Sequence, residues 1–167
     1  ISIGARTSIQ DGTVIHCTAD LATVIGDDCV VGHNAHLEGC TIEPHCLIGS
    51  GSVVLHRVVV RSGALVGAGA LVPNDTEVPS RAMALGVPCK IREDAVADGA
   101  YQYAVDKYVQ NGHWYRAELR RELGEGFITT VARRGYQFVA DVHTVTAEPV
   151  RDATDAEHRG SPASPAS

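Results

Sequence analysis

A branched or long aliphatic residue returns almost every sixth position over residues 3–78. These residues are Ile3, Ile9, Ile15, Ile25, Val31, Leu37, Ile42, Ile48, Val54, Val60, Val66, Val72 and Val78. A six-residue period fits neither a helix nor the two-residue alternation of a simple strand. It is typical of a solenoid whose triangular coils each take three hexapeptides, with the aliphatic residue inward. The alternative is a set of ordinary short strands joined by turns, which so long an in-register series disfavours. The pattern therefore predicts a mainly β, single-stranded parallel β-helix over residues 1–92.

Two steps break the period and set the register between coils. The step after Ile15 is ten residues instead of six, which leaves about four extra residues for a loop within 17–23. The step after Leu37 is only five residues. Counting three faces per coil then stacks Ile15 on Leu37. Because the residue after an inward residue points outward, His16 and Glu38 should be neighbours on one outer face, at the usual strand spacing of about 4.8 Å.

Other histidines lie around this pair. His33 is near the corner that leads to the same face, and its direction takes it away from its own chain's His16, and toward a neighbouring subunit if three solenoids associate. His36 also points outward, stacked over Val14. Two further histidines are expected to be solvent-facing corner or strand residues outside the cluster, namely His45 and His56.

Several stretches match motifs of one known family. They are Gln10-Asp11-Gly12-Thr13-Val14-Ile15-His16, Thr23-Val24-Ile25-Gly26-Asp27, Val31-Gly32-His33, Leu37-Glu38-Gly39-Cys40 and Gly86-Val87-Pro88. They resemble the gamma-class carbonic anhydrases and their homologues, over residues 1 to about 121, and both motif order and irregular spacing agree. The resemblance implies a left-handed parallel β-helix, a homotrimer, and a zinc or iron site made by three histidines between subunits.

The resemblance assigns roles to particular residues. His16 matches the first metal ligand and His33 the second. Gln10 and Asp11 match polar residues beside the metal, where they could serve catalysis or merely satisfy a turn. The third histidine of the family falls on Glu38.

This third position departs from the pattern. Zinc accepts two histidines and a carboxylate, so Glu38 can still complete a site. An anionic ligand lowers the positive charge felt by bound water, which should then ionise less readily. His36 is the competing third ligand, reached by a modest swing of the strand.

The function implied by the resemblance is reversible hydration of carbon dioxide to bicarbonate by metal-bound hydroxide, with Gln10 helping to place water or substrate. Glu38 leads us to expect weak or lost activity. Three alternatives stay open: a hexapeptide acyltransferase that uses coenzyme A and His36 or His16, a metal-dependent thioesterase, and a non-catalytic trimeric scaffold.

Composition and charge limit the classes of partner and the cellular location that we expect. A net charge of −6 argues against a general nucleic-acid binder, and no apolar run reaches transmembrane length. Five cysteines without CxxC spacing are typical of reduced thiols in a cytoplasmic protein. The chain opens on Ile1 almost in register, which suggests that N-terminal coils are missing.

The pattern changes after the repeats. Apolar residues at helical spacing predict a flanking α-helix over 93–122, with Gly112 as its weak point. A β-hairpin is predicted within 123–146, and it resembles the closing hairpin of winged-helix regulators, although no recognition helix precedes it. Residues 147–167 have linker composition and are expected to be disordered.

Overall fold

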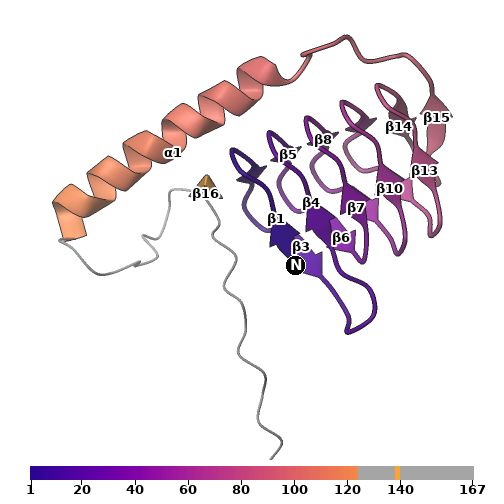
Figure 1. Ribbon diagram of the computed structural model, residues 1–167, viewed down its shortest axis with the longest axis horizontal. Helices are drawn as coiled ribbons and strands as arrows, with labels where there is room; N and C mark the ends of the chain where they lie inside the picture. The colour runs from indigo at the N-terminus through magenta and orange to yellow at the C-terminus, as the bar shows by residue number, and fades with distance from the viewer. Residues whose placement is uncertain (124–137, 140–167) are drawn as a thin grey trace, which may run out of the picture.

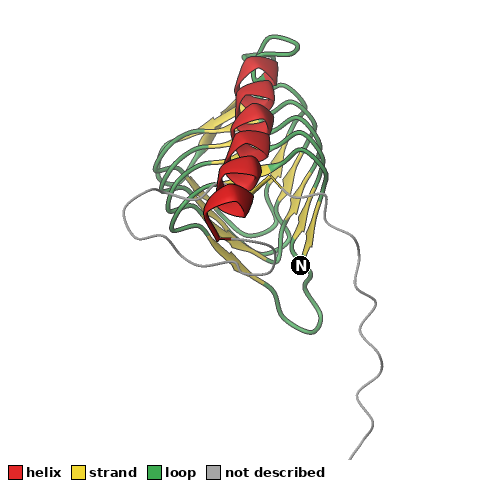
Figure 2. Cartoon of the chain, turned by 90° about the vertical axis from the view of Figure 1, so that its left-hand side faces the viewer, coloured by secondary structure: helices red, strands yellow, loops and turns green. Residues whose placement is uncertain are grey.

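The computed structural model describes residues 1–123 and 138–139, and its core is a parallel β-solenoid of about five coils (Figure 1). The first sheet contains, in order, β1 (Ser2–Ile3), β4 (Val24–Ile25), β7 (Thr41–Ile42), β10 (Val59–Val60) and β13 (Glu77–Val78). The second contains β2 (Ser8–Ile9), β5 (Val30–Val31), β8 (Leu47–Ile48), β11 (Leu65–Val66) and β14 (Met83–Leu85). The third contains β3 (Val14–His16), β6 (His36–Glu38), β9 (Val53–Val54) and β12 (Leu71–Val72). Seen end-on, the coils give a roughly triangular outline (Figure 2). The predicted β-helix is confirmed.

The interior consists of three columns of inward-facing aliphatic side chains, as the six-residue period predicts. From Ile25 to Val78 every one of these residues is at most 1% exposed. Small side chains fill the space inside the corners, among them Cys29, Cys46 and Ala64. Burial of each Val, Leu or Ile contributes about 1.5–3 kcal/mol, so the stacked columns are the main source of stability.

The corners turn through left-handed backbone. Residues with φ between 54° and 74° stack in three columns: Arg6, Asp28, His45, Gly63 and Arg81; Gly12, Asn34, Gly51 and Gly69; and Gly39, Arg57 and Asp75. Backbone hydrogen bonds join successive members, for example from the amide of Asp28 to the carbonyl of Ala5. Each corner therefore has a fixed direction, which determines where the side chains beside it point.

The last coil is followed by a short returning strand that the sequence did not predict. β15 (Lys90–Arg92) pairs antiparallel with β14, after a turn that contains the cis peptide bond between Val87 and Pro88. Arg81 then binds Asp94 at 2.9 Å and Asp98 at 3.2 Å, which holds the following turns against the solenoid.

The flanking helix, α1 (Gln102–Leu123), starts at Gln102 and not at residue 93 as predicted, because β15 and these turns occupy the intervening chain. It is one continuous helix through Gly112. α1 runs back from the last coils toward the N-terminal coil (Figure 1), where Arg6 binds Asp106 at 2.8 Å. Val105, on α1, is only 2% exposed.

A last short strand, β16 (Phe138–Val139), pairs antiparallel with β2 at the N-terminal end of the solenoid. The rest of the hairpin predicted within 123–146, and the tail at 147–167, lie outside the described residues. Within residues 1–123 and 138–139, the structure contains no helix with the length and apolar character needed to cross a membrane.

Candidate functional site

The third sheet carries the predicted histidine and carboxylate pair. β3 and β6 pair in parallel, with Val14 opposite His36, Ile15 opposite Leu37, and His16 opposite Glu38. Leu37 is fully buried, so the residues on either side of it face outward. The predicted register of this face is confirmed.

Glu38 is held by two imidazoles of its own chain. His36 Nε2 lies 3.2 Å from Glu38 Oε2, and His56 Nε2 lies 3.2 Å from Glu38 Oε1. The three side chains are 25–37% exposed. The hydrogen bond with His36 is the main reason why the pKa of Glu38 lies below its ordinary value; desolvation opposes this, while the charges of His56 and His16 assist it. Glu38 is therefore kept as a carboxylate.

The prediction that His56 lies outside this cluster is wrong. The five-residue step after Leu37 shortens one corner, so His56 of the next coil lies over Gly39 and reaches back to Glu38. Gly39 has a φ of +56°, and a Cβ placed there would lie 2.8 Å from His56 Cδ2. The short step marked this corner as irregular in the sequence, but it did not give the direction of His56. His45, by contrast, is an exposed corner residue, as predicted.

A buried threonine fixes the strands under the cluster. Thr23 Oγ1 donates a hydrogen bond to the carbonyl of His16 and accepts one from the amide of Gly39 at 2.8 Å. Thr23 closes the extra loop, and Leu21 of that loop lies beside Gly39. Both irregular steps of the repeat therefore meet at this cluster.

The remaining predicted site residues gather at a different corner. His33 Nδ1 lies 3.8 Å from Asp11 Oδ2, and both side chains are largely exposed. Gln10 is only 6% exposed, and its backbone N–H donates a hydrogen bond to the carbonyl of Val31. The structure thus brings His33 to Asp11 but not to the pair of His16 and Glu38.

The donor types suit a metal, but one chain does not assemble them. Imidazole and carboxylate ligands are those that zinc accepts. Among the described residues, no three His, Cys, Asp or Glu side chains of the single chain come together as a metal-binding group. His16 and Glu38 are adjacent on the outer face of β3 and β6, and their imidazole and carboxylate groups are of the types that fit a zinc ion.

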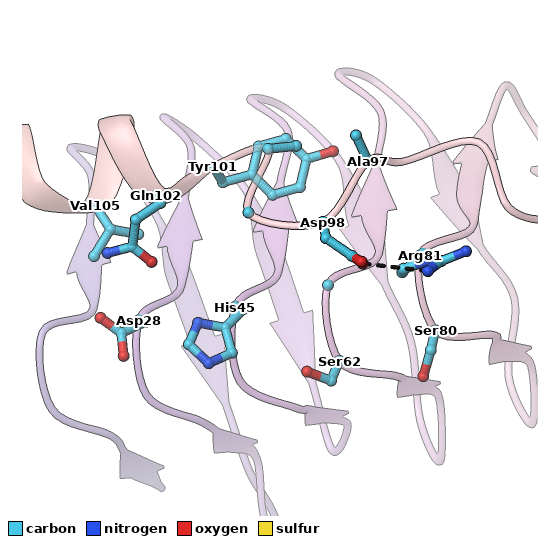
Figure 3. A pocket seen from close by; sticks show the side chains of 13 residues that line it. Asp28, His45, Ser62, Ser80, Arg81, Ala97, Asp98, Tyr101, Gln102 and Val105 are labelled. Atoms are coloured by element: carbon cyan, nitrogen blue, oxygen red, sulfur yellow. Dashed lines mark hydrogen bonds and ion pairs between the residues drawn. The ribbon is translucent and has the colours of Figure 1, made fainter.

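A separate cavity of about 450 Å³ lies between the first column of corners and the turns before α1 (Figure 3). Its wall includes Asp28, His45, Arg81, Asp98 and Tyr101. Arg81 is paired with Asp98 across it. This cavity contains none of the predicted site residues.

The protein is thus a hexapeptide-repeat solenoid with a histidine and carboxylate cluster on one outer face. The family model "Bacterial transferase hexapeptide (six repeats)" matches residues 22–56 and 39–74. A solved structure described as a hexapeptide transferase family protein from Anaplasma phagocytophilum is 32% identical, with a TM-score of 0.59, over 74% of this chain and 69% of that one. The chain belongs to the hexapeptide transferase family, whose members form left-handed β-helices.

Its homologues include gamma carbonic anhydrases. "Gamma carbonic anhydrase 2, mitochondrial" of Arabidopsis thaliana is 42% identical over 96 residues, which are 54% of this chain and 34% of that protein. A carbonic anhydrase of Geobacillus kaustophilus is 34% identical over 117 residues, which are 69% of this chain and 64% of that protein. The chain spans about a third of the length of the plant relative.

Proposed function

We propose that this chain is a gamma-carbonic-anhydrase-like metalloprotein that interconverts carbon dioxide and bicarbonate, working as a homotrimer with zinc or iron between subunits. The observation that carries the proposal is the register of β3 and β6, which makes His16 and Glu38 adjacent outward donors. The homologous gamma carbonic anhydrases support the reaction. Five cysteines, all of them free thiols, support a cytoplasmic location.

The roles divide between two chains. His16 and Glu38 of one chain would hold the metal together with His33 of a neighbouring chain; within each chain His33 Nδ1 lies 3.8 Å from Asp11 Oδ2. When bound, the metal would lower the pKa of coordinated water and so make a hydroxide nucleophile available near neutral pH. Gln10 lies beside this corner and helps to place water or substrate.

Glu38 reduces the expected activity. Its lowered pKa keeps it ionised, as a ligand must be, and an anionic ligand at the metal would oppose the ionisation of bound water. His36, whose Nε2 lies 3.2 Å from Glu38 Oε2, is the competing ligand, and it would have to leave this carboxylate to bind the metal. We therefore propose weak hydration activity.

Metal content tests the proposal. Purified protein loaded with zinc or iron(II) should retain about one ion per subunit interface, and His16→Ala should abolish that stoichiometric binding because it removes one of the few ligands. The matched control is His113→Gln, which changes an exposed histidine on α1. Elemental analysis and sedimentation of all three proteins are the measurements. Full metal occupancy in His16→Ala would refute the ligand role.

An acyltransferase is the second candidate, because the matching family model and the related structure are both described as transferases. In this case His36 or His16 would act as the base for an acceptor, and the protein would bind acetyl-coenzyme A without metal. Calorimetric titration with acetyl-coenzyme A after chelator treatment separates the two. A metal-dependent thioesterase would need both metal and a thioester, and a scaffold would show neither activity.

A further inference from the structure

The imidazole of His56 occupies a place built for it beside the candidate metal ligands. Its Nε2 lies 3.2 Å from Glu38 Oε1, on the oxygen that His36 does not contact. Its ring lies over Gly39. Glycine leaves room for the ring at this position, because a Cβ there would lie 2.8 Å from His56 Cδ2. Leu21 closes the same space from the extra loop, 3.0 Å from that position.

The backbone that carries His56 is fixed on both sides. The next residue, Arg57, has a left-handed φ of 59°, and its amide bonds the carbonyl of Gly39 at 2.8 Å. The carbonyl of His56 accepts a hydrogen bond from the backbone N–H of Asp75, at 3.0 Å. Arg57 also pairs with Asp75 through Nη2 and Oδ2 at 2.9 Å. The imidazole is therefore presented to Glu38 by a corner anchored in the coils on either side.

We propose that His56 is a positioning residue of the metal site, which fixes the carboxylate of Glu38 so that one oxygen is oriented for the metal. This inference rests on the proposed function. A carboxylate with free rotation about its side chain must be ordered when metal binds, whereas one in contact with a fixed imidazole is already ordered. Loss of such a supporting contact costs about 10- to 100-fold in metal affinity.

The test is the zinc affinity of the full chain, measured by competition with a chromophoric chelator. His56→Ala and His56→Phe should both bind zinc about 10- to 100-fold more weakly than wild type, because neither presents a polar nitrogen to Glu38 Oε1. His56→Gln keeps a polar nitrogen at a similar reach and should bind within about threefold of wild type. His113→Gln is the matched control and should bind as wild type does. Unfolding free energies and sedimentation of each variant show whether fold and assembly are intact, and His56→Phe replaces His56→Ala if the latter does not fold.

The outcomes separate the two proposals. Stoichiometric zinc in wild type with unchanged affinity in His56→Ala and His56→Phe overturns the role of His56 and leaves the metal site standing. Weak binding by His56→Gln equal to that of His56→Phe overturns the role of the polar contact between residue 56 and Glu38. Absence of stoichiometric zinc and iron(II) from wild type overturns the proposed function itself, and this inference with it.

Discussion

The inner and outer walls of the third sheet are built from alternating residues of the same strands, yet they follow different rules. Inside, Leu37 and Val54 repeat one another and are fully buried. Outside, His36 and Glu38 face away from the same strand and repeat nothing in the next coil. The interior requires only an aliphatic side chain at every sixth position. The outer wall can therefore vary freely and carry chemistry without cost to the fold.

The largest expected difference between the walls is in stability. Leu37→Ala should lower the unfolding free energy by about 3 kcal/mol, because it removes a fully buried side chain and leaves a cavity. Val14→Ala is the matched change on the outer wall, where Val14 is 51% exposed, and should shift the unfolding free energy by less than about 0.5 kcal/mol. Urea denaturation measures both. Equal losses would contradict the division between the walls.

The next effect tests the crowded corner beneath His56. Gly39→Ala and Gly51→Ala both place a side chain at left-handed φ, of +56° and +66°, which costs about 1–2 kcal/mol. At Gly51 nothing lies within 4 Å of the new Cβ, whereas at Gly39 it meets both His56 and Leu21. Gly39→Ala should therefore be the more destabilising of the two in the same denaturation experiment. The opposite order would mean that the ring does not lie over this glycine.

A third change alters chemistry while leaving the interior intact. Glu38→His should raise carbon dioxide hydration by the zinc-loaded protein if Glu38 is the third ligand, because a neutral ligand favours ionisation of bound water. The unfolding free energy should change less than in Leu37→Ala, since Glu38 lies on the outer wall and loses only its contacts with His36 and His56. Stopped-flow hydration assays give the rate. An unchanged rate would favour His36 as the ligand.

The smallest expected effect is the acid sensitivity of a surface network. Arg61 lies 2.7 Å from Glu43 and 3.0 Å from Glu77, and these bonds lower the pKa of both carboxyl groups. A lowered folded-state pKa stabilises the protein above the ordinary carboxyl pKa, and this contribution is lost as pH falls through the folded value. Stability should thus decline below about pH 4.5, the ordinary Glu value. Glu43→Gln should weaken this decline in denaturation midpoints measured from pH 6 to pH 3, with Glu93→Gln at an exposed position after β15 as the comparison; a steeper decline would contradict the assignment.

The six-residue period of the sequence was enough to predict which residues stack on one another in successive coils. Ile15 and Leu37 could be stacked from sequence because inward residues recur at fixed steps, and His16 and Glu38 followed as their neighbours. His56 could not be placed in this way. Its direction depends on how a corner shortened by one residue accommodates the next coil, and the period carries no information on that.

The structure at the end of the solenoid also could not be predicted from the sequence pattern. The helical spacing of apolar residues correctly indicated α1, but its start at Gln102 depends on contacts distant in sequence. β15 has only three residues and is held by pairing with β14, while Arg81 fixes Asp94 and Asp98. Such tertiary contacts override local propensity.

Both irregular steps of the repeat fall within the first coils, next to the candidate ligands, and the coils after Val60 are regular. Because a solenoid coil touches only its immediate neighbours, the number of later coils is independent of the geometry near the ligands. The length of the solenoid and the geometry of the candidate site are thus separate features of this architecture: whole coils could be removed or duplicated downstream while the face that carries His16 and Glu38 keeps its shape.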